Sequence, residues 1–228
     1  MKNARLLAVA AVIGAMPLVA MAQWSDNFDS YASNATLQGV GGWKGWDNTP
    51  AAAGATSTAQ FLSGPNSQVV QGPTDSVHEY TGVTSGAWTY STNIYIPSAL
   101  TGGNTYFILL NKYQDAGPAT AYNWSVQLNF NLATNTVIDD VTAPASAPVT
   151  LVRDQWIPLR IELNLTSDTL NSYYNNNLIF SGAWKRGNAN AAAALAAVDL
   201  YANNAGSVYY DNFNLVPAPA SMSLLALG

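Results

Sequence analysis

Residues 154–165, Asp-Gln-Trp-Ile-Pro-Leu-Arg-Ile-Glu-Leu-Asn-Leu, decide the fold of this chain. The aliphatic residues are Ile157, Leu159, Ile161, Leu163 and Leu165, and they alternate with Trp156, Pro158, Arg160, Glu162 and Asn164. Successive side chains of a strand point to opposite faces, so this period of two predicts a long strand with one buried face. Pro158 lacks an N–H and suits an edge, a bulge or the start of a strand.

The residues that follow continue the same pattern. Thr-Ser-Asp-Thr at 166–169 and Asn-Asn-Asn at 175–177 are turn sequences, because Asn and Asp bond their own backbone and tolerate left-handed φ. Strand-like runs lie at 170–180 and 207–215. Together these runs predict an antiparallel meander with one buried face.

The order of these pieces resembles the laminin-G-like, concanavalin-A-like jelly rolls. In that group a Trp opens a long strand, a Tyr-Tyr-Asn-Gly-like hairpin follows, and the last strand holds an Asp-Asn or Asp-Asp step. The matching residues here are Trp156, Tyr173, Tyr174, Asn175, Asn176, Asn177, Asp211 and Asn212. Asn177 replaces the usual turn Gly and can also adopt φ > 0. The resemblance covers residues 26–216 and implies an all-β, two-sheet antiparallel jelly-roll sandwich, a fold more firmly than an activity.

Composition favours an exported β-protein. Of the 228 residues, 49% are hydrophobic and only 9% are charged, so amides, hydroxyls and glycines must cover the surface. The absence of cysteine excludes disulfides, thiolate catalysis and cysteine-based zinc sites. A domain of this length can be stabilised by its core alone.

Residues 1–22 have the pattern of a signal peptide. Lys2 and Arg5 precede an apolar run at 6–16, and Ala20-Met21-Ala22 is a small-x-small cleavage site. A membrane anchor is disfavoured because the run is short and Pro17 interrupts it. Without Lys2 and Arg5, 6 basic residues face 13 acidic ones, a net charge of −7. This acidic balance argues against nucleic acid and anionic membranes as partners.

The tail at 217–228 resembles the start of a bacterial Pro-Glu-Pro-type C-terminal sorting signal. Such signals open with Val-Pro-x-Pro and continue into an apolar run that ends in arginines. Ala218 stands where Glu is usual, and only residues 222–227 of an apolar run are present. The alternative is a disordered Pro/Ala tail. We therefore expect a signal peptide at 1–22, a sandwich domain at 23–216 and this tail.

About ten short strands are expected in the domain, with the first and last side by side. At 122–130, alternation predicts Tyr122, Trp124, Val126, Leu128 and Phe130 inward and Asn123, Ser125, Gln127 and Asn129 outward. Strand parity also favours the core for Trp88, Trp124 and Trp156. The alanine-rich segment at 188–197 forms one or two helical turns, or none.

Catalytic motifs are scarce. Laminarinase-like glycosidases of this fold carry Glu-x-Asp-x-Glu on one strand, whereas Glu79 and Glu162 are isolated here. Alginate-lyase relatives use a His and a Tyr beside Arg and Gln, and the residue types are present as His78, Tyr80, Gln127 and Arg160 without that family's motifs. A single His in a strand is more often structural.

Carbohydrate binding is better supported, because amides on outward strand positions suit sugar hydroxyls and loop aromatics can stack on a pyranose ring. The candidate binding residues are Trp43, Trp46, Asp47, His78, Tyr113, Asn123, Gln127 and Arg160. For Trp43 and Trp46 the alternative is packing in the core or as a loop plug.

A structural calcium ion is the cofactor that the resemblance implies, held where the terminal strands meet. Asp29 and Asp211 would supply carboxylate ligands there. The alternative is that Asp211 accepts hydrogen bonds from backbone N–H groups or a turn.

We expect an exported monomer, extracellular or on the cell surface of a bacterium, with the periplasm as the alternative location. It recognises a polysaccharide or cell-surface glycan without catalysis and has no transmembrane span in its mature domain. The alternatives are a polysaccharide lyase or glycoside hydrolase, and a structural matrix protein without a small ligand. Turnover of polysaccharides distinguishes the enzyme, and a glycan array distinguishes the matrix protein.

Overall fold

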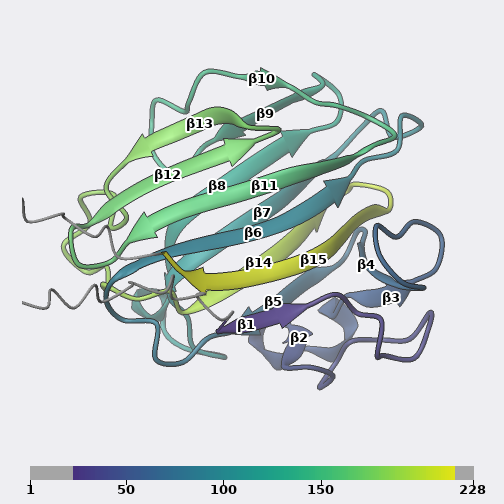
Figure 1. The fold of residues 1–228 in the computed structure, drawn as a ribbon, viewed down its shortest axis with the longest axis horizontal. Helices are drawn as coiled ribbons and strands as arrows, with labels where there is room; N and C mark the ends of the chain where they lie inside the picture. Colours follow the sequence, from purple (N-terminus) through teal and green to yellow (C-terminus); the bar gives the residue numbers. More distant parts are fainter. Residues whose placement is uncertain (1–22, 219–228) are drawn as a thin grey trace, which may run out of the picture.

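The computed structural model of the protein describes residues 23–218, and within this range fifteen strands form two antiparallel sheets. The eight-stranded sheet holds, in order across it, β13 (Asn177–Gly182), β12 (Thr169–Tyr174), β11 (Trp156–Asn164), β6 (Ala87–Tyr95), β15 (Val208–Pro217), β4 (Ser67–Val70) and β3 (Ala55–Ser57), and β1 (Trp24–Asp26) pairs with β15. It faces the viewer in Figure 1.

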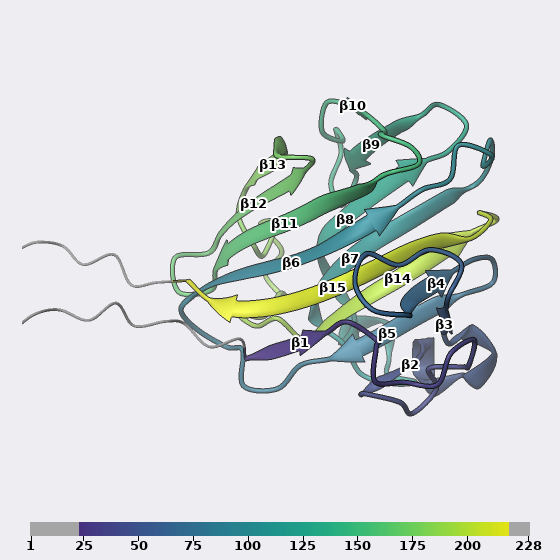
Figure 2. The same cartoon turned by 45° about the vertical axis from the view of Figure 1, so that its right-hand side comes forward.

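The seven-stranded sheet lies behind it. Its strands are, in order, β10 (Val149–Thr150), β9 (Thr136–Asp139), β8 (Asn123–Asn131), β7 (Asn104–Lys112), β14 (Ala197–Asn203), β5 (Asp75–Glu79) and β2 (Trp43–Gly45). The helices among the described residues are three short 3-10 helices, η1 (Trp46–Asn48), η2 (Pro50–Ala52) and η3 (Ala119–Ala121). The turned view shows the two sheets stacked as layers (Figure 2). Among residues 23–218, no helix has the length and apolar character to cross a membrane.

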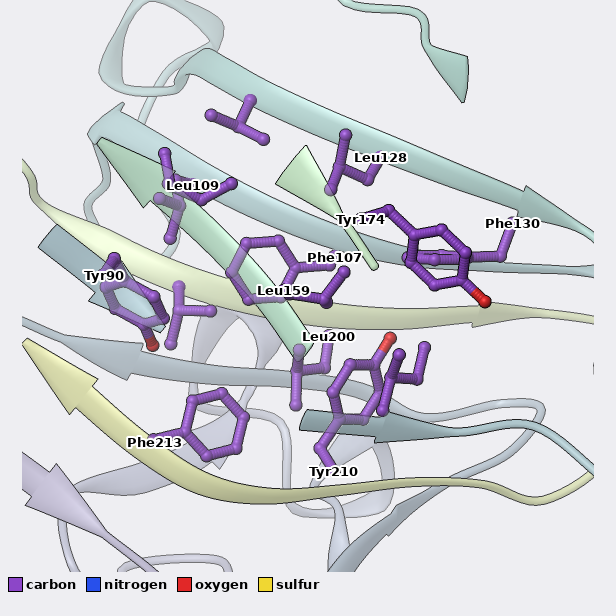
Figure 3. Close-up of a cluster of buried hydrophobic side chains, with 14 of the residues drawn as sticks. Tyr90, Phe107, Leu109, Leu128, Phe130, Leu159, Tyr174, Leu200, Tyr210 and Phe213 are labelled. Carbon is purple, nitrogen blue, oxygen red and sulfur yellow. The ribbon is translucent and has the colours of Figure 1, made fainter. Parts of the chain in front are cut away.

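The core between the sheets comes from alternate residues of both. Leu128, Phe130, Leu159 and Ile161, all predicted inward, are fully buried, and so is Phe213. Figure 3 shows Phe107 and Leu200 of the seven-stranded sheet gathered with Leu159 and Phe213 of the other. Arg160 and Glu162 remain partly exposed, which confirms the predicted register of β11.

The ends of the described chain meet in one sheet. Trp24 of β1 pairs with Leu215 of β15, so the first and last strands lie side by side as expected. The sandwich includes Pro217, one residue beyond the predicted domain limit. The predicted signal peptide at 1–22 and residues 219–228 of the predicted sorting tail lie outside the described residues.

The hairpin between β12 and β13 corrects one detail of the sequence prediction. Tyr174 pairs with Asn177, and the two residues between them, Asn175 and Asn176, have φ of 49° and 60°. Two central residues with positive φ define the tight turn that suits the twist of a hairpin. Asn177 was expected to take the left-handed conformation but instead begins β13. The alanine-rich segment at 188–197 forms turns and no helix.

Two tryptophans, Trp156 and Trp88, differ from the core prediction. Trp156 lies on the outer face of the eight-stranded sheet, where its ring is 5.6 Å from that of Tyr95. The residues of β11 that point inward alternate with Trp156 along the strand and begin with Ile157. Trp88 has the inward parity of Tyr90 and packs against the core, but it lies at the rim and is only partly buried.

Replacing Ile161 by alanine should lower the free energy of unfolding by about 2–5 kcal/mol, because the substitution removes buried methyl groups and leaves a cavity. Urea denaturation measures the change. Arg160→Ala is the control on the same strand and should cost about 1 kcal/mol or less, because its ion pair is partly exposed. A larger loss for Arg160→Ala than for Ile161→Ala would contradict the register.

Candidate functional site

A bulge in β8 turns a tryptophan out of the core. Leu109 of β7 pairs with Val126, but the next residue, Leu110, pairs with Trp124, so Ser125 has no partner on β7. One extra residue reverses the facing of the side chains beyond it. Trp124 therefore lies on the outer face of the seven-stranded sheet with 37% of its surface exposed. The prediction that Trp124 is inward was wrong, and the same holds for Tyr122 before it.

A second bulge on β7 faces the first. Asn111 has no partner on β8, because Lys112 already pairs with Asn123. The Asn111 side-chain amide donates hydrogen bonds of 2.8 Å to Ser125 Oγ and 2.8 Å to Asn123 Oδ1. The side-chain oxygen of Asn111, Oδ1, accepts a hydrogen bond from the backbone N–H of Ala192 at 3.1 Å. The two extra residues are both buried and thus hold each other in place.

A buried ion pair between Arg186 and Asp139 hydrogen bonds to the backbone of the β8 bulge. Arg186 Nε donates to the Ser125 carbonyl oxygen at 2.6 Å, and Arg186 Nη2 donates to Asp139 Oδ2 at 2.6 Å. The guanidinium carbon lies 3.5 Å from the ring centroid of Phe180. Burial lowers the pKa of Arg186 and raises that of Asp139, while the attraction between them opposes both shifts. Arg186 also has a φ of 53°, an unusual conformation for a residue of its size.

Four aromatic side chains gather on the outer face beside this bulge. The ring of Trp46 stacks on that of Tyr122, with centroids 5.1 Å apart and planes at 29°. It lies nearly parallel to Trp124 at 6.4 Å and meets Tyr113 edge-on at 4.9 Å. We call Trp46, Tyr113, Tyr122 and Trp124 the aromatic cluster.

Two loops carry Trp46, Tyr113 and Tyr122 of the aromatic cluster and hydrogen bond to each other, while Trp124 lies on β8. The backbone N–H of Asp47 donates to the Tyr113 hydroxyl at 2.9 Å, and Asp47 Oδ1 accepts the Tyr122 hydroxyl at 2.8 Å and the Ala116 N–H at 2.9 Å. Gly45 permits the sharp turn before Trp46, because a Cβ there would lie 2.0 Å from the Thr49 carbonyl oxygen. The loops therefore hold Trp46 in one position.

A hollow of about 520 Å³ lies next to Trp124. Its lining residues are Asn123, Trp124, Gln127, Val141, Thr142, Arg186 and Asn188. Side-chain amides and a hydroxyl thus surround one exposed indole. Sequence reasoning missed Trp124, Tyr122, Thr142, Arg186 and Asn188. The one signal for the bulge is the polar Asn111 directly after the apolar run at 107–110.

Five of the eight predicted binding residues lie together at this end of the face. Trp46, Asp47 and Tyr113 form the loop contacts, while Asn123 and Gln127 line the hollow. Trp46 is half-buried among other rings, so Trp124 is the more exposed aromatic of the cluster.

Trp43 and His78 belong to the core instead. Trp43 is fully buried, and its indole N–H donates to Asp26 Oδ2 at 2.9 Å. His78 is 7% exposed, with its ring centroid 4.3 Å from that of Trp24 and 5.4 Å from that of Trp43. Burial lowers the pKa of His78 to about 4, so it is neutral at physiological pH. The structural alternatives for both residues are confirmed.

Arg160 lies on the outer face of the other sheet. It pairs with Glu162 on its own strand, and its guanidinium lies 3.9 Å from the centroid of the Tyr173 ring. Alternation correctly predicted that Arg160 points outward. The sandwich has two outer faces, however, and Arg160 occupies the one opposite Gln127.

The residue sets of the enzyme alternatives do not converge. Glu79 pairs with Lys44 on the outer face of the seven-stranded sheet, whereas Glu162 is on the opposite face. Of the lyase-like set, His78 and Tyr80 pack against interior rings, with the Tyr80 hydroxyl 2.7 Å from that of Tyr90. Gln127 and Arg160 lie on separate faces.

A pair of buried carboxyl groups lies near the aromatic cluster. Asp199 of β14 is flanked by Ile108 and Val77 and is only 3% exposed. Its side chain hydrogen bonds to that of Asp75, and burial raises the pKa of both, most strongly for Asp199. Two carboxyl groups in direct contact must share a proton.

The structure supplies part of what a calcium site needs. Asp211 is fully buried, and its carboxylate accepts the N–H groups of Leu62, Ser63 and Asn212 at 2.8, 3.1 and 2.7 Å, as the alternative to calcium binding predicted. Asp29 differs, because its Oδ1 is buried without a donor. Within residues 23–218, no group of three His, Cys, Asp or Glu is arranged for a metal. Calcium takes about 6–8 oxygen ligands, and Asp29 Oδ1 is one candidate, so the site stays a prediction.

Comparison with known proteins supports the fold. No family model and no curated protein matches this chain. The cellulose-induced protein Cip1 is 16% identical with a TM-score of 0.57, over 86% of this chain and 98% of that one. The carbohydrate recognition domain of Emp46p in its potassium-bound form is 12% identical, with a TM-score of 0.51 over 83% and 94%.

A sialidase is 8% identical with a TM-score of 0.59. The match covers 87% of this chain but only 19% of the sialidase, so the chain spans about a fifth of that protein. At these identities the likeness establishes the fold alone. It confirms the predicted two-sheet antiparallel jelly-roll sandwich.

Asp199→Asn should flatten the pH dependence of stability. A carboxyl group with a raised pKa in the folded state contributes stability at low pH, which is lost as the pH rises through the folded-state value. As the pH rises from about 4, the ordinary pKa of an aspartate, through the raised folded-state pKa, the wild type should therefore lose stability relative to Asp199→Asn. Asp154→Asn is the control, because the pKa of Asp154 is lowered by its bond to Ser98. Because the lowered pKa of His78 makes stability rise with pH over part of the same range, the measurement is the difference between the two proteins. Parallel pH profiles for the wild type and Asp199→Asn would contradict the shared proton.

Calcium should raise the melting temperature if Asp29 and Asp211 hold the ion, because a ligand that binds only the folded state adds about 2.7 kcal/mol at one hundred times its Kd. Thermal unfolding in calcium, in magnesium and in chelator measures this. Asp29→Asn should remove the response. Identical melting curves in calcium and in chelator would show that no such site exists.

Proposed function

We propose that this protein is a non-catalytic carbohydrate-binding domain, and that it binds its glycan at the hollow beside Trp124. The observation that carries the proposal is the outward position of Trp124, 37% exposed next to a hollow of about 520 Å³. A large aromatic side chain at the surface loses apolar burial. Here a bulge and a buried ion pair hold it there.

The chemistry of the hollow matches a sugar. An indole face offers an apolar surface for the C–H groups of a pyranose ring, while the side chains of Asn123, Gln127, Asn188 and Thr142 offer donors and acceptors for its hydroxyls. Asp139 neutralises Arg186, so the charge near the hollow does not select an ionic ligand. We infer neutral hydrogen bonding plus stacking as the mode of recognition.

Affinity should be modest. Each hydrogen bond exchanged with water adds about 1 kcal/mol, and an open hollow covers only part of a sugar. We expect Kd values on the order of micromolar to millimolar. Since no ion pair contributes, binding should change little with salt.

Export, a glycan partner and a monomeric state are also part of the proposal. One similar structure is described as a carbohydrate recognition domain, although the likeness alone shows only the fold. The signal-like residues 1–22 support export, with a polysaccharide or cell-surface glycan as partner and a monomeric domain. A matrix protein without a glycan ligand would give no response on a glycan array.

Trp124→Ala should reduce glycan affinity at least about tenfold, a loss of about 1.4 kcal/mol. A glycan array identifies the ligand, and titration calorimetry measures the affinity. The melting temperature should change little, because the indole is already partly exposed.

The matched control is Trp156→Ala, which removes a partly buried indole from the outer face of the other sheet. It should leave binding unchanged. Equal losses in the two variants would indicate nonspecific binding to tryptophan, and full binding by Trp124→Ala would place the site elsewhere.

A further inference from the structure

A second pair of aromatic residues lies on the same outer face, away from the aromatic cluster. Tyr106 of β7 pairs with Tyr201 of β14, and their rings stack with centroids 5.6 Å apart and planes at 23°. Both side chains are partly buried. Tyr201 also lines a hollow of about 470 Å³ with Gly72, Pro73 and residues 202–205. We call Tyr106 and Tyr201 the tyrosine pair.

The sheet register fixes the separation between Trp124 and the tyrosine pair. Trp124 lies opposite Leu110, which is four residues along β7 from Tyr106. Four residues of an antiparallel strand span about 13 Å. Tyr201 is on β14, two strands from β8, which adds about 10 Å sideways. The two aromatic positions are therefore on the order of 16 Å apart, too far for one sugar ring to touch both.

Fixed polar groups line the way between them. Gln127 and Asn129 are neighbours on the outward side of β8 and donate side-chain hydrogen bonds of 2.8 Å to the two oxygens of Asp140. Asn104 donates to Asn129 Oδ1 at 2.7 Å. These amides are held in one orientation before any ligand arrives, which lowers the entropy lost on binding.

The charges along this path select against acidic ligands. Asp140 lies beside Gln127 and Asn129, and the Asp75–Asp199 pair lies next to Tyr201 and Ile108. The whole chain has a net charge of −5. A carboxylated or sulfated polysaccharide would be repelled, whereas a neutral one would not.

We propose that the tyrosine pair is a second contact point for the same ligand, a linear neutral polysaccharide that crosses the outer face from Trp124 to Tyr201. This inference rests on the proposed function and adds a ligand class and a minimum length. A chain that reaches both positions gains contacts from both within one binding event. Affinity therefore rises with chain length until the oligosaccharide spans the face.

A length series tests the proposal. Neutral oligosaccharides from disaccharide to octasaccharide, prepared from the polysaccharide that the array identifies, are titrated against wild type, Trp124→Ala and Tyr201→Ala. Trp124→Ala should weaken every length. Tyr201→Ala should leave the shortest oligosaccharides unaffected and weaken the longest about tenfold.

Two controls accompany the series. Tyr209→Ala removes a tyrosine from the outer face of the eight-stranded sheet and should leave all lengths unaffected. Oligosaccharides of uronic acids, matched in length, should bind more weakly than the neutral ones. If Tyr201→Ala does not fold, Asn203→Ala removes a different lining residue of the same hollow and should give the same length-dependent loss.

The outcomes separate the two proposals. Equal affinity for short and long oligosaccharides, with no effect of Tyr201→Ala, would overturn the extended site and leave binding at Trp124 intact. Tighter binding of the uronic acids would overturn the neutral ligand class. Absence of binding at every length would contradict the proposed function itself.

Discussion

The hydrogen bond between Asn111 and Ser125 is the contact on which the outer face depends. It joins the extra residues of two facing bulges, and with Arg186 it satisfies polar atoms that are buried from water. A buried polar group left without its partner costs about 1–3 kcal/mol, so the two bulges stabilise each other. The consequence lies one residue away, where Trp124 leaves the core.

Much of the fold could be predicted from the sequence because alternation is a local property. The strand around Ile161 and the segment from Val126 to Phe130 show their inward positions in any stretch of four residues. Trp124 could not be predicted in this way. A single unpaired residue, Ser125, reverses the parity beyond it, and only the register with the neighbouring strand reveals that it is unpaired.

The site shows the same limit. Trp43 and Trp46 share one glycine-flanked loop, yet pairing of β2 with β5 buries the first and the turn after Gly45 sends the second outward. Arg160 and Gln127 both point outward from their strands, but the sequence does not say which outer face each one occupies. Alternation separates inside from outside, and only the topology decides which outward residues meet.

The outer face of the seven-stranded sheet also differs from an ordinary solvated face. Val77, Ile108, Leu110 and Ala197 form a small apolar cluster there, covered in part by Trp46 and three tyrosines. Rings that rest on an apolar layer have little freedom left to lose when a ligand arrives. Stability and recognition thus use the same contacts on this face. A shallow surface that loses little conformational entropy on binding can hold a ligand through a few weak interactions. Such binding is expected for a neutral sugar chain.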